Sequence, residues 1–150
     1  MAAFLDTSAL VKHFVVETGS GEITALVESD TELLICELAT IEGVSALSKK
    51  VRKGEMSSSD FRRHLRAMVL FLNSGRCEII PIDEEVKWQA RAILSTWALS
   101  HALGSLDALQ LAAAVAAKRA MGLVEFYSAD RRQLAAAEAQ GFAVRNPGLE

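Results

Sequence analysis

Short apolar runs alternate with longer amphipathic stretches along this chain of 150 residues. Five runs are short and mainly apolar, and they lie at residues 2–5, 33–36, 77–80, 124–128 and 142–144. Such runs predict buried strands, because a strand covered on both faces of its sheet needs no polar side. The stretches between the runs carry apolar residues three and four positions apart, which predicts helices.

Seven helices are predicted between these strands. They cover residues 8–16, 21–30, 38–53, 57–73, 83–102, 103–122 and 131–140. Ser, Asp and Gly residues near their ends supply caps and stops. Three of these helices have apolar stripes that we expect to face inward: Ile41, Val44, Leu47 and Val51; Phe61, Leu65, Met68, Val69 and Leu72; and Val86, Ala90, Ile93, Leu94 and Trp97.

Strands that alternate with one or two helices predict an α/β fold, in which helices cover both faces of a parallel sheet. The length fits one domain, so residues 1–150 are interpreted as a single domain. Ligands of such folds bind beyond the carboxyl ends of the strands, where the strand order reverses. Candidate chemistry is therefore expected at that edge of the sheet.

The stretch LGSLDALQLAAAVAAKRAMG, residues 103–122, predicts a helix that is apolar on nearly all sides. Such a helix lies inside a domain, and we expect Leu106, Leu109 and Leu111 to be buried. Asp107 lies near its start, where an ionised carboxylate is costly without a metal ion, a cation or hydrogen-bond donors. Taken alone, Asp107 is more simply explained as an acid that complements the helix dipole.

Three further acids stand at comparable places. Asp6 directly follows the first predicted strand, and Asp130 follows the fourth by two residues. Glu42 lies early on the helix after the second strand. A helix that follows a strand begins at the carboxyl edge, so these acids are expected there, joined by Asp107 if two successive helices return the chain to that edge. Each acid alone also fits a helix cap or a boundary position.

Four converging carboxylates repel one another, and their pKa values rise. Hard divalent cations such as Mg²⁺ relieve this repulsion, because they bind carboxylate and water oxygens. Thr7, Ser8 and Ser128 are close enough in sequence to hold the carboxylates or a metal-bound water. The chemistry that fits is metal-assisted hydrolysis of a phosphodiester. The three histidines have no visible acid or nucleophile partner, which argues against a catalytic triad.

Composition and charge add further expectations. Hydrophobic residues make up 51% of the chain, which indicates surplus apolar surface for an oligomer or partner interface. No stretch predicts a membrane span or a signal peptide, so we expect a cytoplasmic protein with Cys36 and Cys77 as buried, reduced thiols. Residues 49–66 carry a net charge of +5 against −8 for the remainder. This basic stretch fits either a polyanion-binding patch or a solvated helix hairpin.

The four acids lie in segments that together resemble a known family. The segments are FLDTSALVK with Asp6, LATIEGVSAL with Glu42, LDALQLAAA with Asp107, and FYSADRRQLAAAEAQGFAVRNP with Asp130. In this order and spacing, over nearly the whole chain, they resemble the PIN-domain ribonucleases, and within them the VapC toxins of type II toxin–antitoxin pairs. Each segment alone is a weak signal, and the four together on an alternating α/β pattern are a strong one.

The resemblance implies a three-layer α/β/α sandwich with a parallel sheet of four or five strands. It implies an endoribonuclease dependent on Mg²⁺ or Mn²⁺, in which Asp6, Glu42, Asp107 and Asp130 bind the metal and carry the catalysis. It also implies an RNA substrate, a homodimer, and a cognate VapB-like antitoxin whose C-terminal tail covers the acidic groove.

Two details of the resemblance concern substrate contacts. Family members often carry a basic or polar residue shortly before the third acid, where this chain has Gly104-Ser105-Leu106. Substrate contacts at that point therefore stay open. Within the resemblance, six basic residues are candidates for holding the RNA backbone or the antitoxin: Lys12, Lys49, Lys50, Arg62, Arg63 and Arg66.

Two other functions compete with the nuclease. An α/β phosphatase or phospho-acceptor domain would use Asp6 as nucleophile, but such domains usually need a second Asp nearby and a Lys at a later strand end, and neither is visible. A catalytically inactive, PIN-like interaction module would use the surplus apolar surface to bind a helical partner. The complete set of four acids argues against that module.

Overall fold

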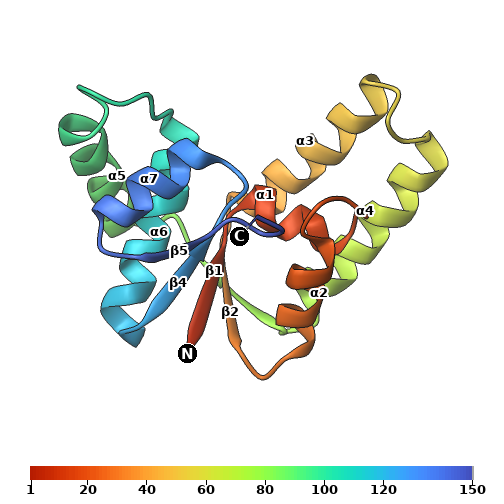
Figure 1. Ribbon diagram of the computed structural model, residues 1–150, viewed down its shortest axis with the longest axis horizontal. Coiled ribbons are helices and arrows are strands. Elements are labelled where there is room, and N and C mark those ends of the chain that lie inside the picture. Colours follow the sequence, from red (N-terminus) through yellow and green to blue (C-terminus); the bar gives the residue numbers. More distant parts are fainter. Residues whose placement is uncertain (150) are drawn as a thin grey trace.

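Five parallel strands form one sheet in the computed structural model, which describes residues 1–149. The order across the sheet is β3-β2-β1-β4-β5 (Figure 1). The strands are β1 (Ala2–Leu5), β2 (Glu32–Cys36), β3 (Cys77–Ile80), β4 (Val124–Tyr127) and β5 (Ala143–Arg145). All four pairings are parallel. The predicted α/β fold with a parallel sheet is confirmed, and the number of strands is five.

The helices cover both faces of this sheet and complete three layers. On one side lie α1 (Thr7–Leu10), the 3-10 helix η1 (Val11–His13), α2 (Ser20–Glu28), α3 (Ala39–Arg52) and α4 (Ser58–Asn73). On the other side lie α5 (Glu84–Thr96), α6 (Ser105–Met121) and α7 (Arg131–Ala139) (Figure 1). The α3–α4 hairpin projects past the edge of the sheet at which the strands end (Figure 1).

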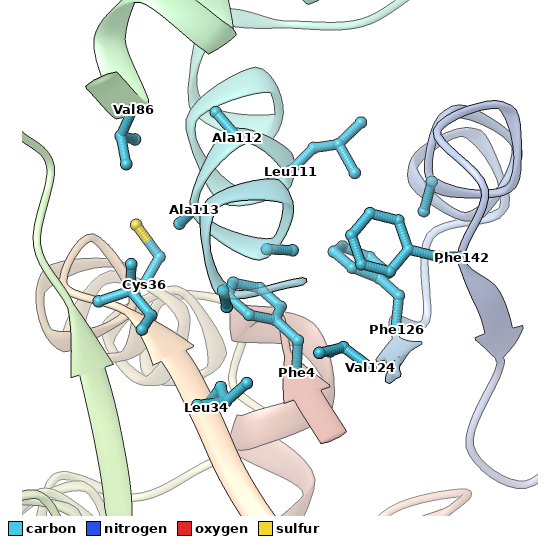
Figure 2. Packing of buried hydrophobic residues seen from close by; sticks show 14 of the residues in the cluster. Phe4, Leu34, Cys36, Val86, Leu111, Ala112, Ala113, Val124, Phe126 and Phe142 are labelled. Atoms are coloured by element: carbon cyan, nitrogen blue, oxygen red, sulfur yellow. The ribbon is translucent and has the colours of Figure 1, made fainter. Parts of the chain in front are cut away.

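Alternate residues of the strands serve the two faces. Phe4 and Phe126 stack on the α6 side with ring centroids 5.4 Å apart, and they form a core with Leu34 and the alanines of α6 (Figure 2). Leu5 and Ile35 point to the opposite face and pack with α1 and α2. The small alanines of α6 let this helix lie close to the sheet, so it becomes the buried helix that the sequence predicts.

The helix expected at residues 83–102 ends at Thr96, and the helix expected at residues 8–16 is divided into two pieces. The structure has only α1 and the short η1 there, because the chain turns back on itself before α2. The buried Lys12 ammonium donates to the carbonyl oxygen of Thr18 at 2.6 Å. Gly19 is the N-cap of α2, and the Ser20 hydroxyl donates to the carbonyl oxygen of Val15 at 2.9 Å and so holds the turn.

Three side chains predicted to face inward are exposed instead. Ile41 is 69% exposed, Leu106 is 52% exposed and Val69 is 46% exposed. The buried residues of α3 are Ala39, Gly43 and Leu47, so the side of this helix that packs inward is not the side that carries Ile41. Helical spacing finds an apolar stripe, but it does not show which side of the helix the neighbouring layer covers.

Two further observations concern the thiols and the lengths of the helices. Cys36 and Cys77 are buried and are not joined to each other in a disulfide. Within residues 1–149, none of the helices has the length and hydropathy that a membrane crossing demands.

Candidate active site

The site lies at the carboxyl end of β1, where the strand order reverses. β1 is followed along the chain by β2 on one side, and the chain later returns to pair β4 with its other side. Asp6 comes directly after β1 and caps α1, because its Oδ1 accepts the Ala9 amide at 2.9 Å. The same oxygen accepts the Ser8 hydroxyl at 2.7 Å. The capping role and the candidate catalytic role therefore coincide in Asp6.

Glu42 reaches the site from the first turn of α3. Its Oε1 accepts the Thr7 hydroxyl at 2.9 Å and the side-chain amide of Gln110 at 2.8 Å. Gln110 also donates to the Thr7 hydroxyl oxygen at 2.9 Å. This three-membered network joins α1, α3 and α6, and it fixes one oxygen of the Glu42 carboxylate.

Asp107 reaches the same edge because α5 and α6 form an antiparallel pair between β3 and β4 (Figure 1). In this pair α5 leads the chain to the carboxyl edge, and α6 begins there. The prediction that two successive helices return the chain to this edge is therefore met. The buried side chain of Gln133, on α7, donates to the Asp107 carbonyl oxygen at 2.9 Å. That bond ties the first turn of α6 to α7.

Asp130 caps α7, and its Oδ1 accepts the Arg132 amide at 2.9 Å. Its own amide donates to the hydroxyl of the buried Ser128 at 3.0 Å. The neighbouring Ala129 amide donates to the Ser8 hydroxyl at 2.9 Å. The loop after β4 is thus bonded to the loop after β1, which holds Asp130 near Asp6.

All four predicted acids line one cavity of about 530 Å³. The cavity is also lined by Thr7, Ser8, Leu38, Ile41, Ser45, Ala46, Lys49, Leu106 and Gln110. The acids come from the end of β1, from α3, from α6 and from the loop after β4. The structure therefore brings together side chains that are up to 124 positions apart in the sequence.

Burial raises the pKa of Asp6 from 3.8 to about 6. The hydroxyls of Ser128 and Ser8 and the amide of Ala9 oppose this rise, whereas the negative charge of Asp107 adds to it. A carboxyl group that lines a cavity and has a shifted pKa is typical of functional sites, because such sites use burial and neighbouring charges to shift the pKa.

Burial also raises the pKa of Asp107, and the negative charges of Asp130 and Glu42 add to the rise. Asp107 thus experiences repulsion from two other acids, and it repels Asp6 in turn. The carboxylates are close enough to oppose one another's ionisation, which is the electrostatic condition that a bound cation relieves.

The donor set fits a hard divalent cation, since all four side chains offer carboxylate oxygens and the hydroxyls of Thr7 and Ser8 lie beside them. Within residues 1–149, however, no three His, Cys, Asp or Glu side chains are already grouped as a metal centre. The four acids line one cavity, and one oxygen of the Glu42 carboxylate already accepts hydrogen bonds from Thr7 and Gln110.

Two buried amides of the site do not follow from the sequence pattern. Gln110 is 2% exposed and Gln133 is 1% exposed, and the Oε1 atom of each is buried without a hydrogen-bond partner among the described residues. Gln110 stands three residues after Asp107, so it lies on the same side of α6. A single amide in an otherwise apolar helix is the signal that points to it.

The six basic candidates are dispersed. Lys49 lines the acidic cavity. Lys12 is buried and pairs with Glu17 at 3.3 Å, and Lys50 pairs with the same carboxylate at 2.9 Å. The three arginines, Arg62, Arg63 and Arg66, are exposed on α4 and do not line the cavity.

The family model described as PIN domain matches residues 3–139. The chain therefore belongs to the PIN domain family. No curated protein sequence matches the chain.

Solved structures with the same fold come from several bacteria. The chain is similar to FitAcB from Neisseria gonorrhoeae, with 20% identity, a TM-score of 0.64, and 97% of each chain covered. It is similar to VapBC2 from Rickettsia felis bound to a DNA fragment from its promoter, with 16% identity, a TM-score of 0.64, and 97% of this chain and 98% of that chain covered. It is also similar to VapC20 from Mycobacterium tuberculosis, a Sarcin-Ricin loop cleaving toxin, with 18% identity, a TM-score of 0.63, and 97% of this chain and 100% of that chain covered. At these identities the likeness shows the fold.

Proposed function

We propose that the chain is a metal-dependent endoribonuclease and the toxin of a type II toxin–antitoxin pair. The observation that carries this proposal is the single cavity lined by Asp6, Glu42, Asp107 and Asp130, in which burial and neighbouring negative charge raise the pKa of Asp6 and of Asp107. A chain that gathers four acids at one sheet edge loses stability through their repulsion, and a cation site explains why it does so. The PIN domain match and the likeness to an RNA-cleaving toxin support RNA as the substrate.

The four carboxylates would hold Mg²⁺ or Mn²⁺, which activates a water molecule for attack on phosphorus and stabilises the negative charge on the leaving oxygen. The chain supplies the positioning. Ser8 and the Ala9 amide fix one oxygen of Asp6, and Thr7 and Gln110 fix one oxygen of Glu42. No side chain of the site is required to form a covalent intermediate.

The proposal also includes two protein partners, a second copy of the chain and an antitoxin. A homodimer and a cognate VapB-like antitoxin fit the surplus of exposed apolar side chains, and a similar structure from Klebsiella pneumoniae is a toxin–antitoxin complex by name. Expression of the chain alone should then arrest growth, and co-expression of a small protein encoded next to it should relieve the arrest. A cytoplasmic location follows from an RNA substrate.

The test is RNA cleavage by variants that keep the fold. Asp6→Asn and Asp107→Asn should each reduce Mg²⁺-dependent cleavage of total cellular RNA by at least about a hundredfold, because each removes a charge that holds the cation. Asp30→Asn is the matched control, since Asp30 lies near the opposite end of the sheet, in the loop before β2. Circular dichroism verifies that all variants fold.

Cleavage at the wild-type rate by either site variant would contradict the nuclease proposal. The same experiment separates it from the phosphatase alternative. A phosphatase that uses Asp6 as nucleophile would trap phosphate on Asp6 and leave RNA intact.

A further inference from the structure

A second cavity, of about 270 Å³, adjoins the acidic one and shares Ser8, Ala46 and Lys49 with it. We name it the lysine groove. Its remaining lining residues are Val11, Lys12, Glu17, Lys50, Lys53, Glu55 and Ala129. Four lysines against two glutamates give the groove a net positive charge, directly beside a cavity that is strongly negative.

The two cavities are joined along one face of α3. Residues 42, 46, 49 and 53 follow one another at intervals of three or four, so they share a face of the helix. At a rise of about 1.5 Å per residue, Lys49 stands about 10 Å and Lys53 about 16 Å beyond Glu42 along the helix axis. The face therefore passes from a carboxylate to two successive ammonium groups.

The lysines of the groove divide into two kinds. Lys12 and Lys50 are engaged, because both bond to Glu17 and thereby hold the segment between η1 and α2. Lys49 and Lys53 are exposed, and neither forms an ion pair within residues 1–149. These two ammonium groups are available to a ligand, and their sites are built on a helix that the engaged pair anchors.

The start of the same helix has a different character. Leu38 and the exposed Ile41 line the acidic cavity at the beginning of α3, and Leu106 lines it from α6. Among residues 1–149, Lys49 is the one Lys or Arg that lines the acidic cavity. Arg132 lies beside the acids from α7, but it is paired with Asp130 at 3.7 Å, so the positive charges without a partner lie on the α3 side.

We propose that the lysine groove binds the phosphates on one flank of the cleaved linkage, with Lys49 and Lys53 as the contacts. This inference rests on the proposed nuclease function and adds a direction to it. An acidic cavity repels a phosphodiester, and a neighbouring groove of opposite sign offsets that repulsion. Because the unpaired ammonium groups lie on the α3 side of the acids, the strand is held more strongly by its backbone charge on that flank of the cut than on the other.

The test compares two variants of equal charge change, Lys49→Gln/Lys53→Gln and Arg62→Gln/Arg66→Gln. Both are combined with Asp107→Asn, which stops cleavage during the measurement. The probe is a short single-stranded RNA with a fluorescent label, titrated at several salt concentrations. Losing two phosphate contacts should weaken binding about tenfold at low salt and reduce the slope of log K against log salt by about 1.4. The arginine variant on α4 should change both quantities little.

Neutral methylphosphonate linkages test the direction. Placed on one flank of the probe, they should weaken binding to the protein with intact lysines, and placed on the other flank they should not. In the Lys49→Gln/Lys53→Gln variant neither placement should matter. Equal losses of RNA affinity in the lysine and arginine variants would contradict the proposal that the lysine groove binds phosphates. Equal effects of the two methylphosphonate placements would contradict it as well.

These outcomes remain separate from the nuclease proposal. If the wild type cleaves RNA and the lysine variant binds the probe normally, the groove is wrong and the nuclease stands. If the wild type neither cleaves RNA nor binds the probe, both proposals fail.

Discussion

The side chain of Gln110 connects three of the elements that build the site. It donates to Glu42 and Thr7 and is buried in a helix that is otherwise apolar. A partner that orients a ligand of a metal commonly matters almost as much as the ligand itself. Gln110 therefore belongs to the site although it offers no charge.

Replacing this amide should weaken the binding of metal. In Gln110→Leu the Glu42 carboxylate loses one of the donors that orient it, and the Mn²⁺ affinity measured by calorimetry should fall about tenfold. Gln89→Leu is the control, because Gln89 bonds to Arg119 on the far side of the α5–α6 pair. An unchanged Mn²⁺ affinity in Gln110→Leu would mean that the network only packs the core.

The raised pKa of Asp6 makes a second prediction at this scale. A carboxyl whose pKa rises from 3.8 in the unfolded chain to about 6 in the fold stabilises the fold below pH 3.8, and this stabilisation is lost as the pH rises through 6. Asp6→Asn removes this loss of stability, because the amide does not ionise, and it keeps an oxygen that accepts from Ser8 and Ala9. Without metal, the variant should thus be more stable than the wild type at pH 7.5, by up to about 3 kcal/mol.

Urea unfolding at pH 4 and pH 7.5 in the presence of a chelator measures this difference. The advantage of Asp6→Asn should be small at pH 4, and saturating Mg²⁺ should reduce it at pH 7.5. A variant that is less stable than the wild type at both pH values would show that Asp6 serves only as a cap.

The elements of the fold follow largely from local patterns. The five apolar runs became the five strands within one or two residues, because buried parallel strands carry a continuous apolar signal. The α1 region does not follow, since the turn there depends on side-chain bonds of Lys12 and Ser20 to carbonyl oxygens six and five residues away in the chain. Bonds from side chains to the backbone leave no periodic trace in a sequence.

The contact between α3 and α4 gives a prediction at the scale of elements. A Cβ added to Gly43 would stand 2.7 Å from the sulfur of the buried Met68, so this glycine sets how closely the two helices pack. Gly43→Ala should destabilise the protein by about 1–2 kcal/mol, because the overpacking outweighs the gain in helix propensity. Gly21→Ala in α2 has open space around its Cβ and should not destabilise. Thermal unfolding of both variants checks the difference in sign.

The candidate site shows where prediction from sequence stops. Asp6, Glu42, Asp107 and Asp130 could be predicted to lie at one edge, because strand ends and helix starts meet there. The network around Glu42 could not, since the register between α1, α3 and α6 is decided by core packing. The sequence places Lys12 among the basic candidates, but in the structure Lys12 is buried and its ammonium group holds the turn before α2.

At the scale of the molecule, the fold sorts charge into two adjoining cavities. The net charge of −3 conceals this arrangement, because the +5 of residues 49–66 offsets much of the −8 carried by the remainder. The reversal of strand order beside β1 brings the acids together, and the length of α3 leads from them to the lysine groove.

The most direct measurement is a calorimetric titration of metal-free protein with Mn²⁺ at pH 7.5, made on the wild type, Asp6→Asn, Asp107→Asn and the Asp30→Asn control. If the four acids share a cation, the wild type and the control bind Mn²⁺ alike, and each site variant loses at least about tenfold in affinity. Equal Mn²⁺ binding by all four proteins, or binding by none of them, would contradict the shared site.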